Sequence, residues 1–435
     1  MSEIKKRSSQ GEFKKLTDLF SSVYLVRDPY VLKTMSAVAI SQQIPGDPIW
    51  VVIVGASGSG KSEYINSLVK CVGVFPLSTL TSHTFISGMK GRGQETSLLL
   101  KIQNGIITFK DLTSLLSEHK DDRSVIMAQL REIYDGKYSK TFGTGETIPW
   151  SGKITVIAGS TYAIHTLKQQ YTAMGERFLF YNMIQPDRVE AARRTMQNQE
   201  EGNMDQKRLM LAENMGIYMN DTIVIPTQLP RITKEFEDEV LIISELSTRA
   251  RSDVERNYKS PQQEITAVHP PEMPTRFAGQ LLGMSRSLSI MNWNEIGILE
   301  LLPKDKTIIH KLALDSVTMS RRVSMQELSR YESITTAGLA VKLNFPTNTI
   351  RRWLEDLNAL GIADRQKGRG PQGDSWQIKK TYRDVIGKFE GIEMQHMELI
   401  DMEGQAESDE EKAVIPDELK KVGSGEIDIK SLELN

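Results

Sequence analysis

Two kinds of hydrophobic pattern alternate along the first half of the chain. Residues 13–45 carry apolar positions at helical spacing and end in the turn cluster IPGDP, which predicts a helical N-terminal segment. From residue 48 to about residue 187 come five short β-type runs separated by segments of helix length, namely IWVVIVG, GVFPLST, GIITF, KITVIAG and RFLFYNM. This alternation is typical of a parallel sheet covered by helices, so we expect an α/β fold.

The pattern changes twice more before the C-terminus. Residues 188–300 lose the strand signal and predict helices, with a proline-rich break at VHPPEMPTR. A further unit follows, and then a charged segment with few aromatic residues. We therefore expect an N-terminal helical segment (1–46), a sheet domain (47–190), a helical lid (191–300), a small domain (305–386) and a disordered acidic tail (387–435).

Charge separates the tail from the rest of the chain. Residues 387–435 contain 14 acidic residues and 5 lysines, a net charge of −9, which leaves 49 basic and 42 acidic residues elsewhere, a net charge of +7. Such a body tolerates a polyanionic partner, and the tail either competes with that partner or docks to another protein. Cys71 is the one cysteine and no apolar run is long enough to span a membrane, so we expect a reducing, cytoplasmic setting.

A phosphate-binding loop is the clearest motif. GASGSGKS, residues 55–62, matches GxxxxGK[ST] between a predicted buried strand and a predicted helix. Glycines there let backbone N–H groups turn toward phosphate oxygens, and we expect Lys61 to reach the β- and γ-phosphates of ATP while Ser62 holds Mg²⁺. The predicted phosphate-binding residues are Gly55, Ser57, Gly58, Ser59, Gly60, Lys61 and Ser62.

Hydrolysis requires an acidic residue at the end of a neighbouring strand. Asp111 follows the GIITF run and is the candidate metal ligand and catalytic carboxylate, although Lys110 stands where hydrolysing ATPases usually carry the first acid of a pair. Asp111 could also cap the helix that we expect from Leu112 onward. In that case Glu132 or Asp135 would have to replace it.

Two further strand boundaries carry polar groups. Ser160 and Thr161 end the KITVIAG run and could hydrogen-bond the γ-phosphate or the attacking water, although a strand-to-helix cap would look the same. Arg177 immediately precedes the RFLFYNM run. It could extend from one subunit to the nucleotide that a neighbouring subunit binds, or form a surface ion pair.

The order of these pieces resembles AAA+ ATPases, and two details narrow the resemblance to the MCM-type group of helicase ATPases. EIYDGKYSKTFGTGETIPWSGK predicts a hairpin similar to the one that lines the ring pore and touches DNA in that group, which would make Lys137 and Lys140 DNA contacts. Exposed hairpin lysines also serve solubility. GERF resembles the arginine motif of the group, and PEMPTRFAGQL places Arg276 like its second sensor arginine. The stretches GDPIWVVIVGASGSGKSE and KDLTSLLS resemble ATPases carried by phages and integrative elements.

Residues 332–378 resemble a winged helix. Ala337, Ala340 and Leu343 mark a short helix, and Thr347 is the expected cap of a second helix. Ile350, Trp353, Leu354 and Leu357 form the buried face of that second helix. The resemblance implies DNA contacts from Asn348, Arg351, Arg352, Lys367 and Arg369. Winged helices also serve as protein-interaction modules.

The resemblance implies a homo-oligomeric ring, a hexamer, that hydrolyses ATP with Mg²⁺ and moves on DNA as a replicative helicase or translocase of a phage or mobile element. One alternative is a non-translocating ATP switch that docks proteins through its winged helix, such as a helicase loader, a transposition regulator or a defence ATPase. A third reading is an ATP-responsive transcription regulator.

Overall fold

The computed structural model describes residues 11–86, 97–112, 119–166, 177–257, 259–260, 263–368 and 373–388. These residues belong to one compact unit, which does not divide at the predicted boundaries near residues 47, 191 and 305. Among the described helices, none is both long and apolar enough to cross a membrane. The predicted acidic tail lies almost entirely outside the described residues.

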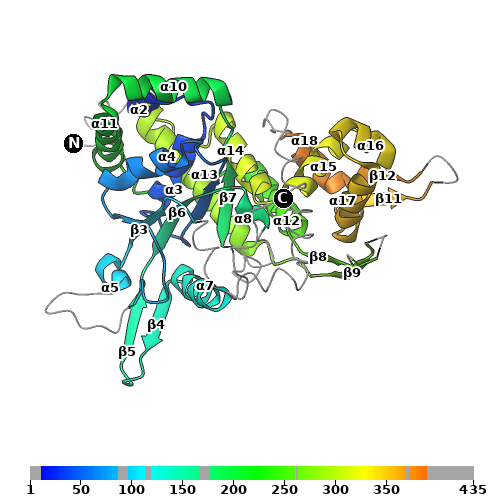
Figure 1. Cartoon of the computed structure of the whole chain (residues 1–435), viewed down its shortest axis with the longest axis horizontal. Helices are drawn as coiled ribbons and strands as arrows, with labels where there is room; N and C mark the ends of the chain where they lie inside the picture. The colour runs from blue at the N-terminus through cyan, green and yellow to red at the C-terminus, as the bar shows by residue number, and fades with distance from the viewer. Residues whose placement is uncertain are drawn as a thin grey trace, which may run out of the picture. The chain divides into compact units, whose positions relative to one another are not determined.

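The five predicted strand runs form one parallel sheet, which confirms the α/β prediction (Figure 1). Its strand order is β2-β3-β6-β1-β7, and register pairs Val54 of β1 with both Ser160 of β6 and Asn182 of β7. The carboxyl ends of these strands therefore meet at one edge of the sheet. The strands are β1 (Trp50–Val54), β2 (Val74–Leu77), β3 (Gly105–Phe109), β6 (Ile154–Ser160) and β7 (Phe178–Asn182).

The predicted N-terminal segment is helical but packs as part of the body. It forms α2 (Glu12–Val23) and α3 (Val31–Ser41), and α3 is buried along its whole length between β6 and the later helix α13. An apolar face on every side is typical of a buried helix. The other helices of the sheet domain are α4 (Lys61–Ser67), η1 (Leu68–Lys70), α5 (Leu98–Ile102), α7 (Lys120–Tyr134) and α8 (Ala163–Thr166).

A β-hairpin projects from the sheet domain between α7 and β6, as predicted (Figure 1). Its strands are β4 (Lys137–Thr141) and β5 (Thr147–Ser151), which pair in antiparallel register. Gly145 adopts a φ of 82° in the turn, a left-handed conformation that glycine tolerates without steric cost.

Residues 188–300 are mostly helical, with one element that the sequence did not reveal. The helices are α10 (Arg188–Glu201), α11 (Met204–Ile217), η2 (Tyr218–Thr222), α12 (Lys234–Ala250) and α13 (Thr275–Ile296). A two-stranded ribbon, β8 (Val254–Arg256) with β9 (Ile265–Val268), lies between α12 and α13. Its strands are short and only half-buried on one face, so they give a weak hydrophobic signal.

The described C-terminal residues contain the two predicted helices followed by the two predicted strands, together with four further elements. In chain order, the elements are α14 (Pro303–Asp315), α15 (Met319–Ser329), β10 (Ile334–Thr335), α16 (Thr336–Leu343), α17 (Thr347–Ala359), β11 (Ala363–Gln366), β12 (Ser375–Ile378) and α18 (Lys380–Gly387). The strands form an antiparallel sheet in the order β10-β12-β11. Ile350, Trp353, Leu354 and Leu357 are buried as predicted, whereas Thr347 does not cap α17, because Pro346 occupies the cap position.

Helix α14 packs against β7 rather than standing apart with the winged unit. Asp315 at its C-terminal end is fully buried, and its carboxylate accepts hydrogen bonds from the Asn182 backbone N–H (2.8 Å) and Lys311 Nζ (2.8 Å). It also accepts one from Arg322 of α15. Asp315 thus ties the end of a central strand to two helices, and the predicted boundary at residue 305 cuts through this contact.

We expect Asp315→Ala to lower the free energy of unfolding by about 3–5 kcal/mol, because the Lys311 and Arg322 charges would stay buried without their carboxylate. Urea denaturation followed by circular dichroism measures this loss. The matched control is Asp238→Ala, whose carboxylate is 57% exposed and lies 3.8 Å from Lys234. That change should cost less than about 1 kcal/mol. Equal losses in the two variants would contradict the role of Asp315.

Candidate functional site

The phosphate loop connects the carboxyl end of β1 to the first turn of α4. Gly58 and Gly60 have φ values of 78° and 87°, a left-handed region that side chains with a Cβ disfavour. Lys61 is the first residue of α4, and its Nζ donates to the carbonyl oxygens of Gly55 (2.7 Å) and Ala56 (2.6 Å). The loop therefore curls around its own lysine.

Lys61 is 8% exposed, which is unusual for a lysine. Burial lowers the pKa of its ammonium group, and the negative charge of Asp111 partly offsets this shift. The two side chains from different strand ends are therefore close enough to interact electrostatically. A buried cation beside glycine-rich backbone is suited to bind an anion with several oxygens.

The other predicted strand-end residues lie beside this loop. The Gly55 N–H donates to the Ser160 carbonyl oxygen (3.2 Å), and the Leu112 N–H donates to the Gly159 carbonyl oxygen (2.7 Å). Because β6 lies between β1 and β3, Ser160 and Thr161 stand between the phosphate loop and Asp111. The structure thus brings together the candidates that the sequence placed on three separate segments. The helix that Asp111 was expected to cap falls outside the described residues.

The donors for a metal ion are few. Ser62 offers a hydroxyl group and Asp111 an exposed carboxylate, and no group of three or more His, Cys, Asp or Glu residues gathers as a metal site in the described ranges. This set does not form a complete protein cage. It does fit Mg²⁺ that arrives with a triphosphate, because that ion usually keeps several waters and takes only one or two protein ligands.

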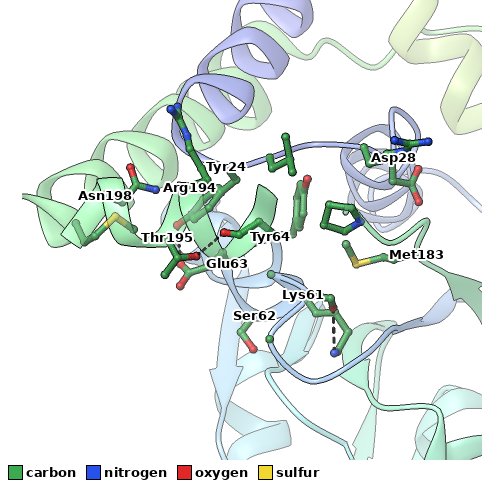
Figure 2. A pocket seen from close by; sticks show the side chains of 18 of the residues that line it. Tyr24, Asp28, Lys61, Ser62, Glu63, Tyr64, Met183, Arg194, Thr195 and Asn198 are labelled. Atoms are coloured by element: carbon green, nitrogen blue, oxygen red, sulfur yellow. Dashed lines mark hydrogen bonds between the residues drawn. The ribbon is translucent and has the colours of Figure 1, made fainter. Parts of the chain in front are cut away.

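A cavity of about 350 Å³ opens beside the phosphate loop (Figure 2). Its remaining walls come from residues 24–28, residues 183–186 and the helices α10 and α11. Buried Asp28 joins two of these walls, since its carboxylate accepts hydrogen bonds from Tyr181 Oη (2.7 Å) and the Ile184 N–H (2.9 Å). The size and the apolar and polar mixture of the lining suit a small-molecule ligand.

Glu63 and Arg208 are two of the charged residues of this cavity that the sequence did not single out. Glu63 follows Ser62 in the first turn of α4, and its carboxylate accepts a hydrogen bond from Tyr24 Oη (2.9 Å). It also accepts bonds from Arg208 of α11, with Nη2 at 2.8 Å from Oε1. Glu63 adjoins the motif and was therefore within reach of sequence reasoning. Arg208 had no local signal, because its partner lies 145 residues away.

The predicted arginines lie at the opposite edge of the sheet. Arg177 precedes β7, which runs parallel to β1, so it lies at the amino-terminal end of the strands. Its Nη2 donates to both carboxylate oxygens of Asp135 (2.9 and 3.1 Å), and its guanidinium carbon lies 5.4 Å from the centre of the Tyr134 ring. Arg276, the second residue of α13, lies 5.8 Å from the same ring centre.

Arg276 lines a second cavity of about 490 Å³ at this edge, together with Asp47, Asp135 and Lys153. Lys153 Nζ donates to the Ser41 carbonyl oxygen (2.8 Å), and burial lowers its pKa to about 8. Asp135 therefore lies far from the phosphate loop along the strands. The structure does not bring Asp135, one of the two alternatives to Asp111, to the phosphate loop. Glu132, one turn earlier in α7, lines the base of the hairpin.

The two hairpin lysines differ in their surroundings. Lys140 is half-buried and donates to the carbonyl oxygens of Ser82 (2.9 Å) and Ile86 (3.1 Å), and burial lowers its pKa. Lys137 is exposed but lies at the base of the hairpin, opposite Ser151. Neither lysine belongs to the turn that forms the hairpin tip.

Part of the polar face of α17 is engaged within the chain. Arg256 of β8 donates to Asp356 (2.6 Å) and to the Arg352 carbonyl oxygen (2.9 Å), while the Arg352 guanidinium donates to Gln263 beside β9. Arg351 is half-buried, and Asn348 and Lys367 are exposed. Arg369 lies outside the described residues.

Comparisons with known proteins add no relative to this picture. No protein-family model matches the chain, and no curated protein sequence matches it either.

Proposed function

We propose that this chain is an AAA+-type ATPase that binds ATP with Mg²⁺ and hydrolyses it where two subunits of a homo-oligomeric ring meet. The observation that carries the proposal is the meeting of the phosphate loop, buried Lys61, Ser160 and Asp111 at one edge of a parallel sheet, beside a cavity. In open α/β sheets, ligands bind at the carboxyl ends of the strands. The carboxyl edge of the sheet is therefore the expected place for the reaction.

The residues divide the work of phosphoryl transfer. The loop N–H groups and Lys61 bind the phosphate oxygens, and Lys61 leaves the carbonyl oxygens of Gly55 and Ala56 to do so. Asp111 and Ser62 would hold the metal ion, which would neutralise the charge that develops on the phosphate. Thr161, half-buried at the end of β6, orients the attacking water.

The location of the two arginines supports catalysis between subunits. Because Arg177 and Arg276 lie at the amino-terminal edge of the sheet, they cannot reach the nucleotide at the carboxyl edge of their own chain. A ring in which one subunit's amino-terminal edge faces its neighbour's phosphate loop brings both cations to the γ-phosphate. Arg177 must then leave the Asp135 carboxylate that now holds it.

The proposal also includes action on DNA. The projecting hairpin and the winged arrangement of α16, α17, β11 and β12 support a DNA motor of the replicative helicase or translocase kind. The contacts of Arg256 with α17 favour the second candidate, a non-translocating ATP switch whose winged unit docks within the chain or to proteins.

We expect Lys61→Ala to weaken ATP binding by about 100-fold or more, because it removes the cation from the phosphate cradle. Isothermal titration calorimetry with Mg²⁺ and ATP measures the dissociation constant. Lys70→Ala, at an exposed lysine of η1, is the matched control and should bind like the wild type. An unchanged ATP affinity of Lys61→Ala would contradict the assignment of the phosphate loop as the ATP site.

Arg276→Ala and Arg177→Ala should each retain ATP binding but lower the ATPase rate by about 1,000-fold, since an arginine finger acts on the transition state. Phosphate release measures the rate. Mixing either variant with Lys61→Ala should restore part of the activity, because a mixed interface can pair an intact arginine with an intact loop. Absence of any restoration would argue against a site shared between subunits.

If the protein is a motor, a forked DNA duplex should stimulate ATP hydrolysis, and its two strands should be separated. The switch alternative predicts an ATPase rate that does not depend on DNA.

Replacing Lys137 and Lys367 together by alanine should reduce the slope of log DNA affinity against log salt concentration by about 2, because each exposed lysine releases about one counterion. Lys234→Ala, on the exposed face of α12, is the control and should leave the slope unchanged.

A further inference from the structure

A carboxylate occupies the helix end where the proposed triphosphate must bind. Glu63 stands one residue after Ser62 in the first turn of α4, and it lines the same cavity as Gly58, Gly60 and Lys61. The carboxylate and the phosphates are both negatively charged, so Glu63 opposes the binding of phosphates in this cavity. An unpaired carboxylate here would repel the ligand.

Arg208 of α11 faces this carboxylate from the opposite wall of the cavity. Its Nη2 lies 2.8 Å from Glu63 Oε1, and its Nε lies 3.1 Å from Oε2, which makes a two-pronged ion pair. A third donor, Nη1, lies 3.2 Å from the carboxylate of Asp205. Since 47% of the Arg208 side chain is exposed, the guanidinium group has room to turn toward a bound ligand.

Arg194, another arginine that lines the cavity, has different hydrogen-bond partners. Arg194 of α10 donates to the backbone carbonyl oxygens of Ser22 and Val23, at the C-terminal end of α2. This contact holds one cavity wall together. Arg208, by contrast, is paired with a side chain of the phosphate-binding helix itself.

We infer that Arg208 is a nucleotide-binding residue supplied by the same chain as the phosphate loop. It cancels the charge of Glu63, so that α4 accepts a triphosphate, and it presents a guanidinium group to the phosphate side of the cavity. Glu63 is a positioning residue, because its carboxylate orients Arg208 and also fixes Tyr24 of the facing wall. The inference rests on the proposed ATP binding.

Calorimetry on the full-length protein with Mg²⁺ and ATP, ADP or AMP tests this role. We expect Arg208→Ala to bind ATP about tenfold more weakly, ADP less so and AMP nearly as well as the wild type, because the repulsion from Glu63 grows with phosphate charge. In Glu63→Gln/Arg208→Ala the repelling carboxylate is gone but the Arg208 guanidinium is still missing, so ATP affinity should recover in part, to about threefold weaker than the wild type. Arg193→Ala, at an exposed arginine of α10, is the control and should bind all three nucleotides normally.

Three results would overturn the inference. Unchanged ATP affinity in Arg208→Ala would show that the charge is not used. An equal loss for ATP, ADP and AMP would mean that Arg208 only holds α11 in place. If the double variant recovers no ATP affinity, the defect of Arg208→Ala does not come from the Glu63 charge. If the wild-type protein binds no nucleotide, the proposed function fails as well, whereas a wild type that binds ATP beside an unaffected Arg208 variant overturns the inference alone.

Discussion

The parallel register of β3, β6 and β1 is the constraint on which the candidate site depends. It aligns three strands whose carboxyl ends carry Asp111, Ser160 and the phosphate loop, and backbone bonds from Gly55 and Leu112 lock those ends together. Each residue alone is an ordinary turn or cap residue. Their value for chemistry comes from the common direction of the strands, since antiparallel pairing would send neighbouring ends to opposite edges.

The same register also keeps Lys61 apart from the arginines Arg177 and Arg276. Lys61 lies at one edge of the sheet, while Arg177 and Arg276 share the Tyr134 ring at the other. Under the proposed function, these two groups of cations would be the two halves of one phosphate site that forms between neighbouring subunits.

Buried carboxylates hold the walls around these halves. Asp28 ties residues 24–30 to the end of β7, and Asp315 ties α14 and α15 to the same strand. Both accept backbone N–H groups just where the strand stops and its ladder ends, so they satisfy groups that would otherwise be buried without partners. Asp28 thus connects two walls of the cavity, and Asp315 holds α14 and α15 against the end of β7.

The sequence by itself determined the local features. Hydrophobic runs gave the five strands, glycine spacing gave the phosphate loop, and the apolar face of α17 gave its buried side, because backbone preference and burial pattern are encoded within a few residues. The hairpin also followed from its strand and turn residues. The sequence did not predict the short strands β8 and β9, because they carry little hydrophobic signal.

Only the tertiary structure decided which charged groups meet. It paired Arg208 with Glu63, Arg177 with Asp135 and Arg256 with α17, and it set Lys140 against backbone carbonyl oxygens. Nothing near these residues in the sequence specifies their partners, because an ion pair across 40 to 150 positions depends on strand register and helix packing. The chemistry of each side chain was therefore readable in advance, and its neighbours were not.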